Sequence, residues 1–287
     1  MTDVRTRHNL PGNPSASPYT DLFIYYLKGL AKTDGRDFGR AFIGAWLEDG
    51  FSFLFFSEPS LAAVERFISV QPCLEFIDKY QMAYSDWQGS ILGPGRFGSF
   101  FITPPWSAAS ETLAIEKQPI ILDPGVVFGS GSHPTTLSSL EALELAFQSD
   151  SFASTLDLGT GTGLLALAAA RLGCPKTLAV DLNLLAVRTA LNNIRLNRLE
   201  DRIMAIQGKA QDFVNVDAEL IVANIHYDVM KELVAAEGFL SKKNFILSGL
   251  LRSQANTILA GLSDKPVRII KKWEIEGIWY TFFGKIT

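Results

Sequence analysis

Residues 154–171 read STLDLGTGTGLLALAAAR, and this stretch decides the fold. Its short apolar run TLDL leads into three glycines that alternate with threonines, and a run rich in Leu and Ala follows directly. This order predicts a strand, a glycine-rich turn and a helix. Glycines at such a turn let the backbone approach a ligand, and the N–H groups at the start of the helix face that ligand.

The spacing of the glycines separates two kinds of nucleotide site. A dinucleotide site carries G-x-G-x-x-G, but counted from Gly159 the third position is Leu164, so the helix-packing glycine is missing. The pattern is instead D-x-G-x-G-x-G, led by Asp157. Asp181 ends the next apolar run, where a carboxylate can accept hydrogen bonds from both ribose hydroxyls. We interpret the loop and Asp181 as an adenosine-type cofactor site; the alternatives are a tight packing turn and a helix cap. The glycines concerned are Gly159, Gly161 and Gly163.

Short apolar runs alternate with amphipathic segments from Leu113 onward, which is typical of an α/β fold with a mostly parallel sheet. The last stretch reads as two strands joined through Glu276-Gly277, which predicts an antiparallel hairpin at the sheet edge. The expected strands are 154–158, 177–181, 202–207, 219–223 and 244–248, and the expected helices are 163–172, 183–196, 228–238 and 251–261.

The pattern of apolar residues in the N-terminal part predicts a small βαβα unit. Residues 22–30 and 51–56 read as strands, and 38–49 reads as a helix, with a second helix from Pro59 to about Ile68. A stretch rich in Gly, Pro and aromatic residues follows, and we expect the domain junction there. The expected organisation is a flexible arm at 1–19, an N-terminal α+β domain at 20–86, a linker at 87–112 and a cofactor-binding domain at 113–287.

Composition excludes several classes of protein. With 47% hydrophobic residues the chain has enough apolar material for a buried core, which excludes a disordered tail. The net charge is −4 and neither half has a cationic excess, so direct nucleic-acid binding is not expected. The two cysteines lie far apart, which argues against a metal site and favours a reducing, cytoplasmic location. No apolar run is long enough for a membrane span.

Two further segments border the predicted site. In 121–144, Ser132 or His133 is the expected N-cap and Pro134 opens a helix that could close over a ligand. His133 could orient a cofactor or serve only as the cap. In the other segment, Asn224 follows the apolar run LIVA, and His226 could relay a proton or simply face solvent.

The runs DPGVVFGSGSHPTT, DLGTGTG, VDLNLLAV, VANI and LSGLL resemble, in order and spacing, the PrmA-type methyltransferases, which modify protein eleven of the large ribosomal subunit. The resemblance covers about residues 84–287 and implies a Rossmann-like class I methyltransferase sheet that uses S-adenosylmethionine. It also implies a ribosomal protein as partner, with lysine or N-terminal amines as acceptors. For the N-terminal domain it implies a ferredoxin-like fold and substrate recognition, although residues 20–80 match only in βαβα outline. The cofactor-binding residues that we expect are Thr136, Gly159, Gly161, Gly163, Asp181, Asn224, Phe128 and His133, with Gly129 and Gly131 lining the approach.

Methyl transfer from a sulfonium requires a neutral amine with its lone pair aimed at the methyl carbon. A lysine amine has a pKa near 10.4, so its neutralisation at pH 7 costs about 4.6 kcal/mol. We expect Asn224 to be the catalytic residue, since its side-chain oxygen and a neighbouring carbonyl can accept the amine hydrogens and aim the lone pair. No general base is evident in the sequence.

Three other functions remain open at this point. A nicotinamide dehydrogenase would need the missing third glycine and a hydride-site acid/base pair. A methyltransferase of another protein, of RNA or of a small molecule would share the cofactor site and use the N-terminal unit differently; the acidic charge balance and the absence of an Asn-Pro-Pro-Tyr-type motif weaken the RNA version. A binding module without catalysis would not need Asp181, the loop glycines and Asn224 together.

Overall fold

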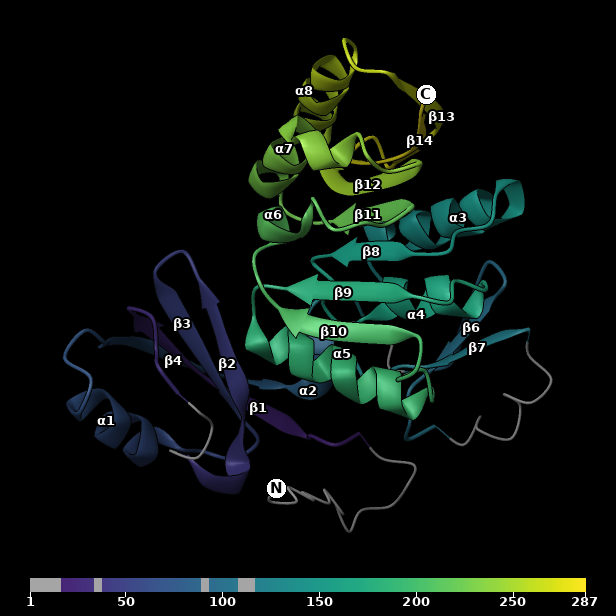
Figure 1. Cartoon of the computed structure of the whole chain (residues 1–287). Helices are drawn as coiled ribbons and strands as arrows, with labels where there is room; N and C mark the ends of the chain where they lie inside the picture. Colours follow the sequence, from purple (N-terminus) through teal and green to yellow (C-terminus); the bar gives the residue numbers. More distant parts are fainter. Residues whose placement is uncertain (1–16, 34–37, 89–92, 108–116) are drawn as a thin grey trace, which may run out of the picture.

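The computed structural model describes residues 17–33, 38–88, 93–107 and 117–287. Most of the arm predicted at 1–19, and parts of the linker predicted at 87–112, lie outside these ranges. Within them the strands form sheets of four, three and seven strands (Figure 1). No helix in these ranges is long and apolar enough to cross a membrane.

The seven-stranded sheet has the order β10-β9-β8-β11-β12-β14-β13. Neighbouring strands from β10 to β12 pair in parallel, and β14 pairs antiparallel with both β12 and β13. The predicted parallel strands and the C-terminal hairpin are therefore confirmed, with Glu276 and Gly277 at positive φ in the turn. The bounds are β8 (Thr155–Leu158), β9 (Thr177–Asp181), β10 (Ile203–Gln207), β11 (Leu220–Asn224), β12 (Asn244–Leu251), β13 (Val267–Ile275) and β14 (Trp279–Ile286).

Helices cover both faces of this sheet because successive strand residues point to opposite sides. In β11, Leu220 and Val222 pack with α3, α4 and the end of α5, whereas Ile221 and Ala223 pack with α6, α7 and α8. Figure 1 shows α6, α7 and α8 together on one side. The four predicted helices are confirmed, and His133 is the N-cap of α3. The bounds are α3 (Pro134–Ser149), α4 (Leu164–Arg171), α5 (Leu184–Leu196), α6 (Ala210–Phe213), α7 (Tyr227–Ala235), η4 (Glu237–Phe239) and α8 (Arg252–Leu262).

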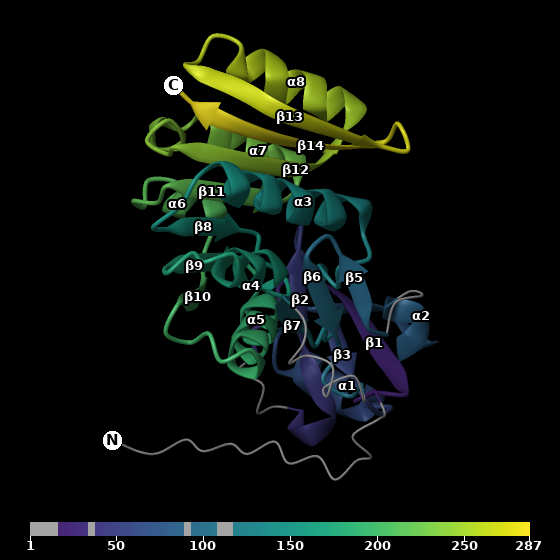
Figure 2. The same ribbon diagram turned by 90° about the vertical axis from the view of Figure 1, so that its right-hand side faces the viewer.

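The N-terminal sheet has the order β2-β3-β1-β4, with every pair antiparallel. Its helix α1 covers one face, where Leu54, Phe56, Val64 and Phe67 form a core. Figure 1 and Figure 2 both show this sheet at the β10 end of the large sheet, away from the β13–β14 hairpin. The bounds are β1 (Asp21–Lys28), η1 (Gly39–Ala41), β2 (Phe42–Glu48), β3 (Phe51–Phe56), α1 (Leu61–Ser69) and β4 (Glu75–Ala83).

The helix predicted at 38–49 is wrong. After the short turn η1, this segment is the strand β2. The physical reason is the pair Asp49-Gly50, whose φ values of 48° and 82° make a two-residue hairpin turn. The turn brings β2 against β3, and the hydrogen bonds between them hold the segment extended. The βαβα outline is thereby corrected to three strands, one helix and a fourth strand.

A small third sheet packs against the core of the part that holds the seven-stranded sheet. In it β6 pairs antiparallel with β5 and parallel with β7. Phe100 and Ile102 of β6 are buried beside Ile120 of β7 and residues of α3 and α4. The described part of the stretch predicted as a linker is thus ordered and packed, while the domain boundaries themselves stay a prediction. The bounds are α2 (Tyr84–Gln88), β5 (Gly95–Phe97), β6 (Phe100–Thr103) and β7 (Gln118–Ile121).

Candidate functional site

The large sheet has a switch point between β8 and β11. From β8 the chain moves outward through β9 to β10, and it then returns to the other side of β8 as β11. In sheets of this kind, ligands bind at the carboxyl ends of the strands beside the switch point. Figure 1 shows the arrowheads of β8, β9 and β10 pointing toward the side where β1–β4 lie. The glycine loop, Asp181 and Asn224 all meet at this edge.

The glycine loop is held by the segment that precedes α3. All three loop glycines have positive φ, and at Gly161 a Cβ would lie 2.5 Å from the carbonyl oxygen of Phe128. The backbone N–H of Thr162 donates to that same oxygen (3.2 Å), and the Thr162 hydroxyl donates to the Gly129 carbonyl (2.7 Å). This contact requires glycine at position 161, and it fixes residues 128–129 over the loop.

Asp181 lies at the end of β9, as predicted, and is only 9% exposed. One carboxylate oxygen accepts the backbone N–H of Gly161 (3.0 Å), and the other accepts that of Asn183 (2.9 Å). Burial raises the pKa of Asp181, and the backbone hydrogen bonds oppose this rise. A carboxylate offers about four acceptor positions, so both oxygens keep capacity for further donors. The role of Asp181 in ribose binding stays a prediction.

Asp157 is fully buried beside the loop. The Thr160 hydroxyl donates to one of its oxygens (2.6 Å), and the other oxygen has no hydrogen-bond partner. Burial is the main cause that raises the pKa of Asp157 to about 7, and the nearby charge of Asp181 raises it further. Near neutral pH this carboxyl is therefore present in both protonated and ionised forms. The sequence motif marked its position but not this chemistry.

The start of α3 forms one wall of the site. His133 caps the helix, because its Nδ1 accepts the backbone N–H of Thr135 (3.3 Å). Its ring lies edge-on to the rings of Phe128 and Trp279, with centroids 5.2 and 4.8 Å away. Burial lowers the pKa of His133, which favours the neutral ring. The sequence left open whether His133 orients a cofactor or caps the helix, and the structure shows the cap. Phe128, which lies beside His133, is 54% exposed.

Asn224 ends β11 opposite Ser248 of β12. Its side chain is half-buried and makes no hydrogen bond to any described residue, so its amide is available to a ligand. Gly249 leaves room for it, since a Cβ there would lie 3.0 Å from Asn224 Oδ1. His226 is exposed and lies 3.6 Å from Asp228, which agrees with the solvent-facing alternative rather than with a proton relay.

Sequence reasoning missed Asn193, a fully buried residue of α5. Its side-chain N–H group donates to the carbonyl oxygens of Asp123 (2.9 Å) and Thr162 (2.8 Å), and its Oδ1 accepts the backbone N–H of Asp123 (2.7 Å). One amide thereby ties the segment before α3 to the glycine loop. The available signal was a polar residue on a helix face that is otherwise apolar.

The sequence also matches a known protein family. A profile of the ribosomal protein L11 methyltransferase (PrmA) family matches residues 71–287. The chain belongs to this family. The resemblance predicted from about residue 84 is confirmed and begins earlier in the chain.

Individual relatives of this PrmA-family chain support the family assignment. It is 36% identical over 201 residues to a ribosomal protein L11 methyltransferase of Desulfitobacterium hafniense, covering 67% of this chain and 62% of that one. It is 34% identical over 208 residues to that of Alkaliphilus oremlandii, covering 70% and 64%. The chain thus spans less than two thirds of the length of these relatives.

A crystal structure of ribosomal protein L11 methylase from Lactobacillus delbrueckii subsp. bulgaricus superposes with a TM-score of 0.57 at 27% identity, covering 68% of this chain and 99% of that one. The large sheet therefore has the class I methyltransferase-like α/β fold, with the antiparallel edge that the sequence predicted.

The PrmA-family chain has buried oxygens without partners around the switch point. Buried polar groups are normally hydrogen-bonded, so such atoms are positions where a ligand or a water molecule can bind. In the part of the chain that the structure describes, five buried side-chain atoms lack partners. Two of them, Thr136 Oγ1 and Asp157 Oδ1, belong to elements that border the site. Thr136 is one of the residues predicted to contact the cofactor.

An apolar groove of about 370 Å³ adjoins this site. All four N-terminal strands line it, and residues 126–128 and Trp87 complete it. Phe128 therefore borders both the glycine loop and the groove. Of the aromatic residues in the predicted linker, Trp87 lines the groove, whereas Phe100 is buried in the core. The groove also holds one carboxylate, Glu48, whose oxygen accepts the indole N–H of Trp46 (3.2 Å).

Proposed function

We propose that this chain transfers methyl groups from S-adenosylmethionine to lysine or N-terminal amines of ribosomal protein L11. The observation that carries the proposal is the family match over residues 71–287, because it includes every segment of the site: the segment before α3, the glycine loop, Asp181 and Asn224. The relatives named above are L11 methyltransferases.

The residues at the switch point suit S-adenosylmethionine, which when bound supplies a methyl group on a positively charged sulfur. Its nucleoside carries no pyrophosphate, and the glycine loop lacks the dinucleotide spacing. Asp181 keeps acceptor capacity for ribose hydroxyls, and Thr136 Oγ1 is a buried atom that still needs a partner. We assign the cofactor contacts to Gly159, Gly161, Gly163, Asp181, Thr136, Asn224 and Phe128, with His133 holding the wall in place.

Asn224 is the residue that we assign to catalysis. Its amide has no partner among the described residues, so Oδ1 can accept a hydrogen from the acceptor amine and orient the lone pair. Alignment and exclusion of water are the main requirements of an in-line transfer. His133 caps α3 and burial lowers its pKa, so we assign it no step in proton transfer.

The N-terminal sheet is the part that we assign to substrate recognition, within proposed domains at 20–86 and 113–287 and a linker at 87–112. Its strand order, with α1 on one face, supports a ferredoxin-like unit whose first helix is replaced by the turn η1 in the described residues. The face opposite α1 carries the groove, where aromatic rings and Glu48 lie close together. Aromatic faces and a carboxylate attract cationic side chains, so a lysine-bearing segment suits this surface.

A methylation assay tests the proposal. The full chain is incubated with radiolabelled S-adenosylmethionine and either purified ribosomal protein L11 or total RNA, and the labelled product is mapped by mass spectrometry. We expect label in L11. The Asn224→Ala variant should lose about 10²-fold in turnover and much less in cofactor affinity in calorimetry, because it removes the alignment of the amine but only one of several cofactor contacts.

The matched control is Asn256→Ala, since Asn256 is exposed on α8 and makes no hydrogen bond to a described residue. It should methylate like the unaltered chain. Label in RNA alone would reject ribosomal protein L11 as the substrate. Absence of S-adenosylmethionine binding would reject methyl transfer as the activity. Full turnover of Asn224→Ala would remove Asn224 from the mechanism.

A further inference from the structure

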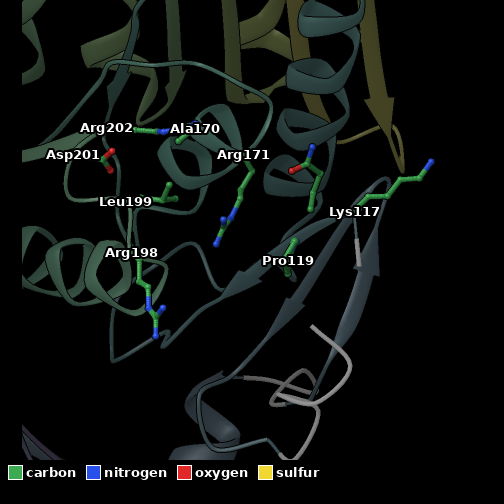
Figure 3. Close-up of a pocket in the computed structure, with 9 residues that line it drawn as sticks. Lys117, Pro119, Ala170, Arg171, Arg198, Leu199, Asp201 and Arg202 are labelled. Atoms are coloured by element: carbon green, nitrogen blue, oxygen red, sulfur yellow. The ribbon is translucent and has the colours of Figure 1, made fainter. Parts of the chain in front are cut away.

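Figure 3 shows a second pocket, of about 330 Å³, which lies away from the candidate site. Its arginines come from the end of α4 and from the connection between α5 and β10, where β9 and β10 begin. The cofactor site lies at the carboxyl ends of the same strands. The two sites therefore share no residue, and the proposed methyl transfer gives this pocket no role.

The pocket concentrates positive charge in a chain whose net charge is −4. Arg171, Arg198 and Arg202 line it, and the single carboxylate in its lining is that of Asp201. None of the three arginines forms an ion pair within the described ranges of the chain. The charge of Arg202 acts on Arg171, and like charges that share a pocket repel unless an anion lies between them, so the lining is complementary to an anion.

Arg171 is the most enclosed of the three. Its Nη2 donates to the carbonyl oxygen (3.3 Å) and to the side-chain oxygen (3.2 Å) of Asn197, while its buried Nε has no partner. Burial and the charge of Arg202 lower the pKa of Arg171. In Figure 3 its side chain extends from α4 into the space between Arg198 and Pro119, and the Lys117 side chain turns away from that space.

Arg198 occupies a backbone position that favours glycine. It follows the C-cap of α5 with φ of 55°, and Leu199 N–H donates to the carbonyl oxygen of Ile194 (3.1 Å), which is the closing bond of a Schellman motif. A side chain in this conformation is strained, and such strain is found where a residue serves a site. In this strained conformation, the Arg198 side chain lines the pocket.

We propose that this pocket binds a phosphate group through Arg171, Arg198 and Arg202. Guanidinium groups pair with phosphate oxygens in a bidentate manner, and several of them around one anion would offset their mutual repulsion. The pocket is larger than a phosphate ion, so a phosphate ester fits as well. A free nucleotide and one phosphodiester of an RNA strand present the same oxygens to such a site.

The test uses the full chain and isothermal titration with inorganic phosphate, adenosine 5′-monophosphate and a short RNA, at constant ionic strength. We expect saturable binding of at least one probe. Arg198→Gly and Arg202→Gln should each weaken it by about tenfold or more, and Lys117→Gln should not change it. S-adenosylmethionine affinity should stay the same in all three variants.

Arg198→Gly separates ligand binding from folding. Glycine adopts a φ of 55° without strain, so this variant should melt at a higher temperature than the unaltered chain when phosphate is absent. Added phosphate should raise its melting temperature less than that of the unaltered chain. Binding of RNA with a steep salt dependence, lost in Arg198→Gly, would identify a phosphodiester as the ligand; binding of phosphate or the nucleotide alone would identify a small molecule. No saturable binding, or equal binding by Arg198→Gly, would overturn the proposal.

Discussion

Two carboxylates at the switch point have different surroundings although they lie close together. Asp181 accepts two backbone N–H groups, whereas Asp157 accepts one hydroxyl and keeps an unpartnered oxygen in a fully buried position. The ionised form of Asp157 is therefore the one that the fold disfavours. This difference has a measurable effect on stability.

We predict that Asp157→Asn changes the pH dependence of unfolding. The folded-state pKa of about 7 lies above the unfolded value near 3.9, so the folded chain binds more protons between these values. The Asp157 contribution to stability is most favourable below pH 4 and is lost as the pH rises to 7. The difference in melting temperature between the variant and the unaltered chain should therefore shift in favour of the variant as the pH rises from 4 to 7.

The control is Asp150→Asn, because the bond from Lys285 lowers the pKa of the exposed Asp150. That contribution is present above the unfolded pKa and is lost as the pH falls, so its slope has the opposite sign. Melting curves of Asp157→Asn that run parallel to those of the unaltered chain at every pH would contradict the assignment.

The site residues that the sequence revealed are those next to the ends of apolar runs. The glycine loop follows β8, and Asp181 and Asn224 are the last residues of β9 and β11, so their place at the sheet edge could be predicted from chain order alone. Asn193 could not be found in this way, because it lies inside α5 and its partners come from two distant segments. Its importance depends on three-dimensional packing.

At the scale of elements, the glycine loop and the segment before α3 act as one unit. We predict that Gly161→Ala prevents cofactor binding and destabilises the fold by about 1–3 kcal/mol, since its Cβ would collide with the Phe128 carbonyl and its φ is 55°. Gly50→Ala is the control, because its φ is also positive but nothing lies within 4 Å of the added Cβ.

Calorimetry with S-adenosylmethionine and thermal unfolding measure the two effects. Gly50→Ala should lose some stability through strain alone and bind the cofactor normally. If both variants bound the cofactor equally well, the close approach of Phe128 would not control the loop.

The elements of the cofactor-binding part could be predicted because each strand and helix carries its own pattern. The N-terminal sheet could be predicted only in part. The strands expected at 22–30 and 51–56 match β1 and β3, whereas β2 is extended only through its pairing with β3. The dipeptide Asp49-Gly50 between two apolar runs was the local signal for that hairpin. Strand β4 was missed because it is an edge strand exposed along most of its length, which hides the usual alternation.

At the scale of the whole molecule, Asn183 joins the N-terminal sheet to the cofactor site. Its side-chain oxygen accepts the backbone N–H of Leu47 in β2 (2.9 Å), while its own backbone N–H bonds Asp181. Leu185 and Ala186 then pack against Leu22 and neighbouring residues of the N-terminal sheet. The proposed recognition surface is thus anchored two residues away from the carboxylate that we assign to the ribose.

We predict that Asn183→Ala loosens this junction without removing the Asp181 bond, which comes from the backbone. The unpaired Leu47 N–H should cost about 1–3 kcal/mol of unfolding free energy. Methylation of the protein acceptor should fall in kcat/KM by a larger factor than cofactor affinity falls. Unfolding in urea, calorimetry and the methylation assay measure these effects, and Asn256→Ala serves again as the exposed control. Equal losses in both functions would contradict a role at the junction.

The ring contact between His133 and Trp279 has a consequence for how the protein matures. Trp279 opens β14, which follows every other part of the site along the chain. During synthesis the glycine loop, Asp181 and Asn224 emerge first, and the wall beside the helix cap is completed only when β14 adds to β12. A nascent chain therefore lacks part of the candidate site until β14 is in place.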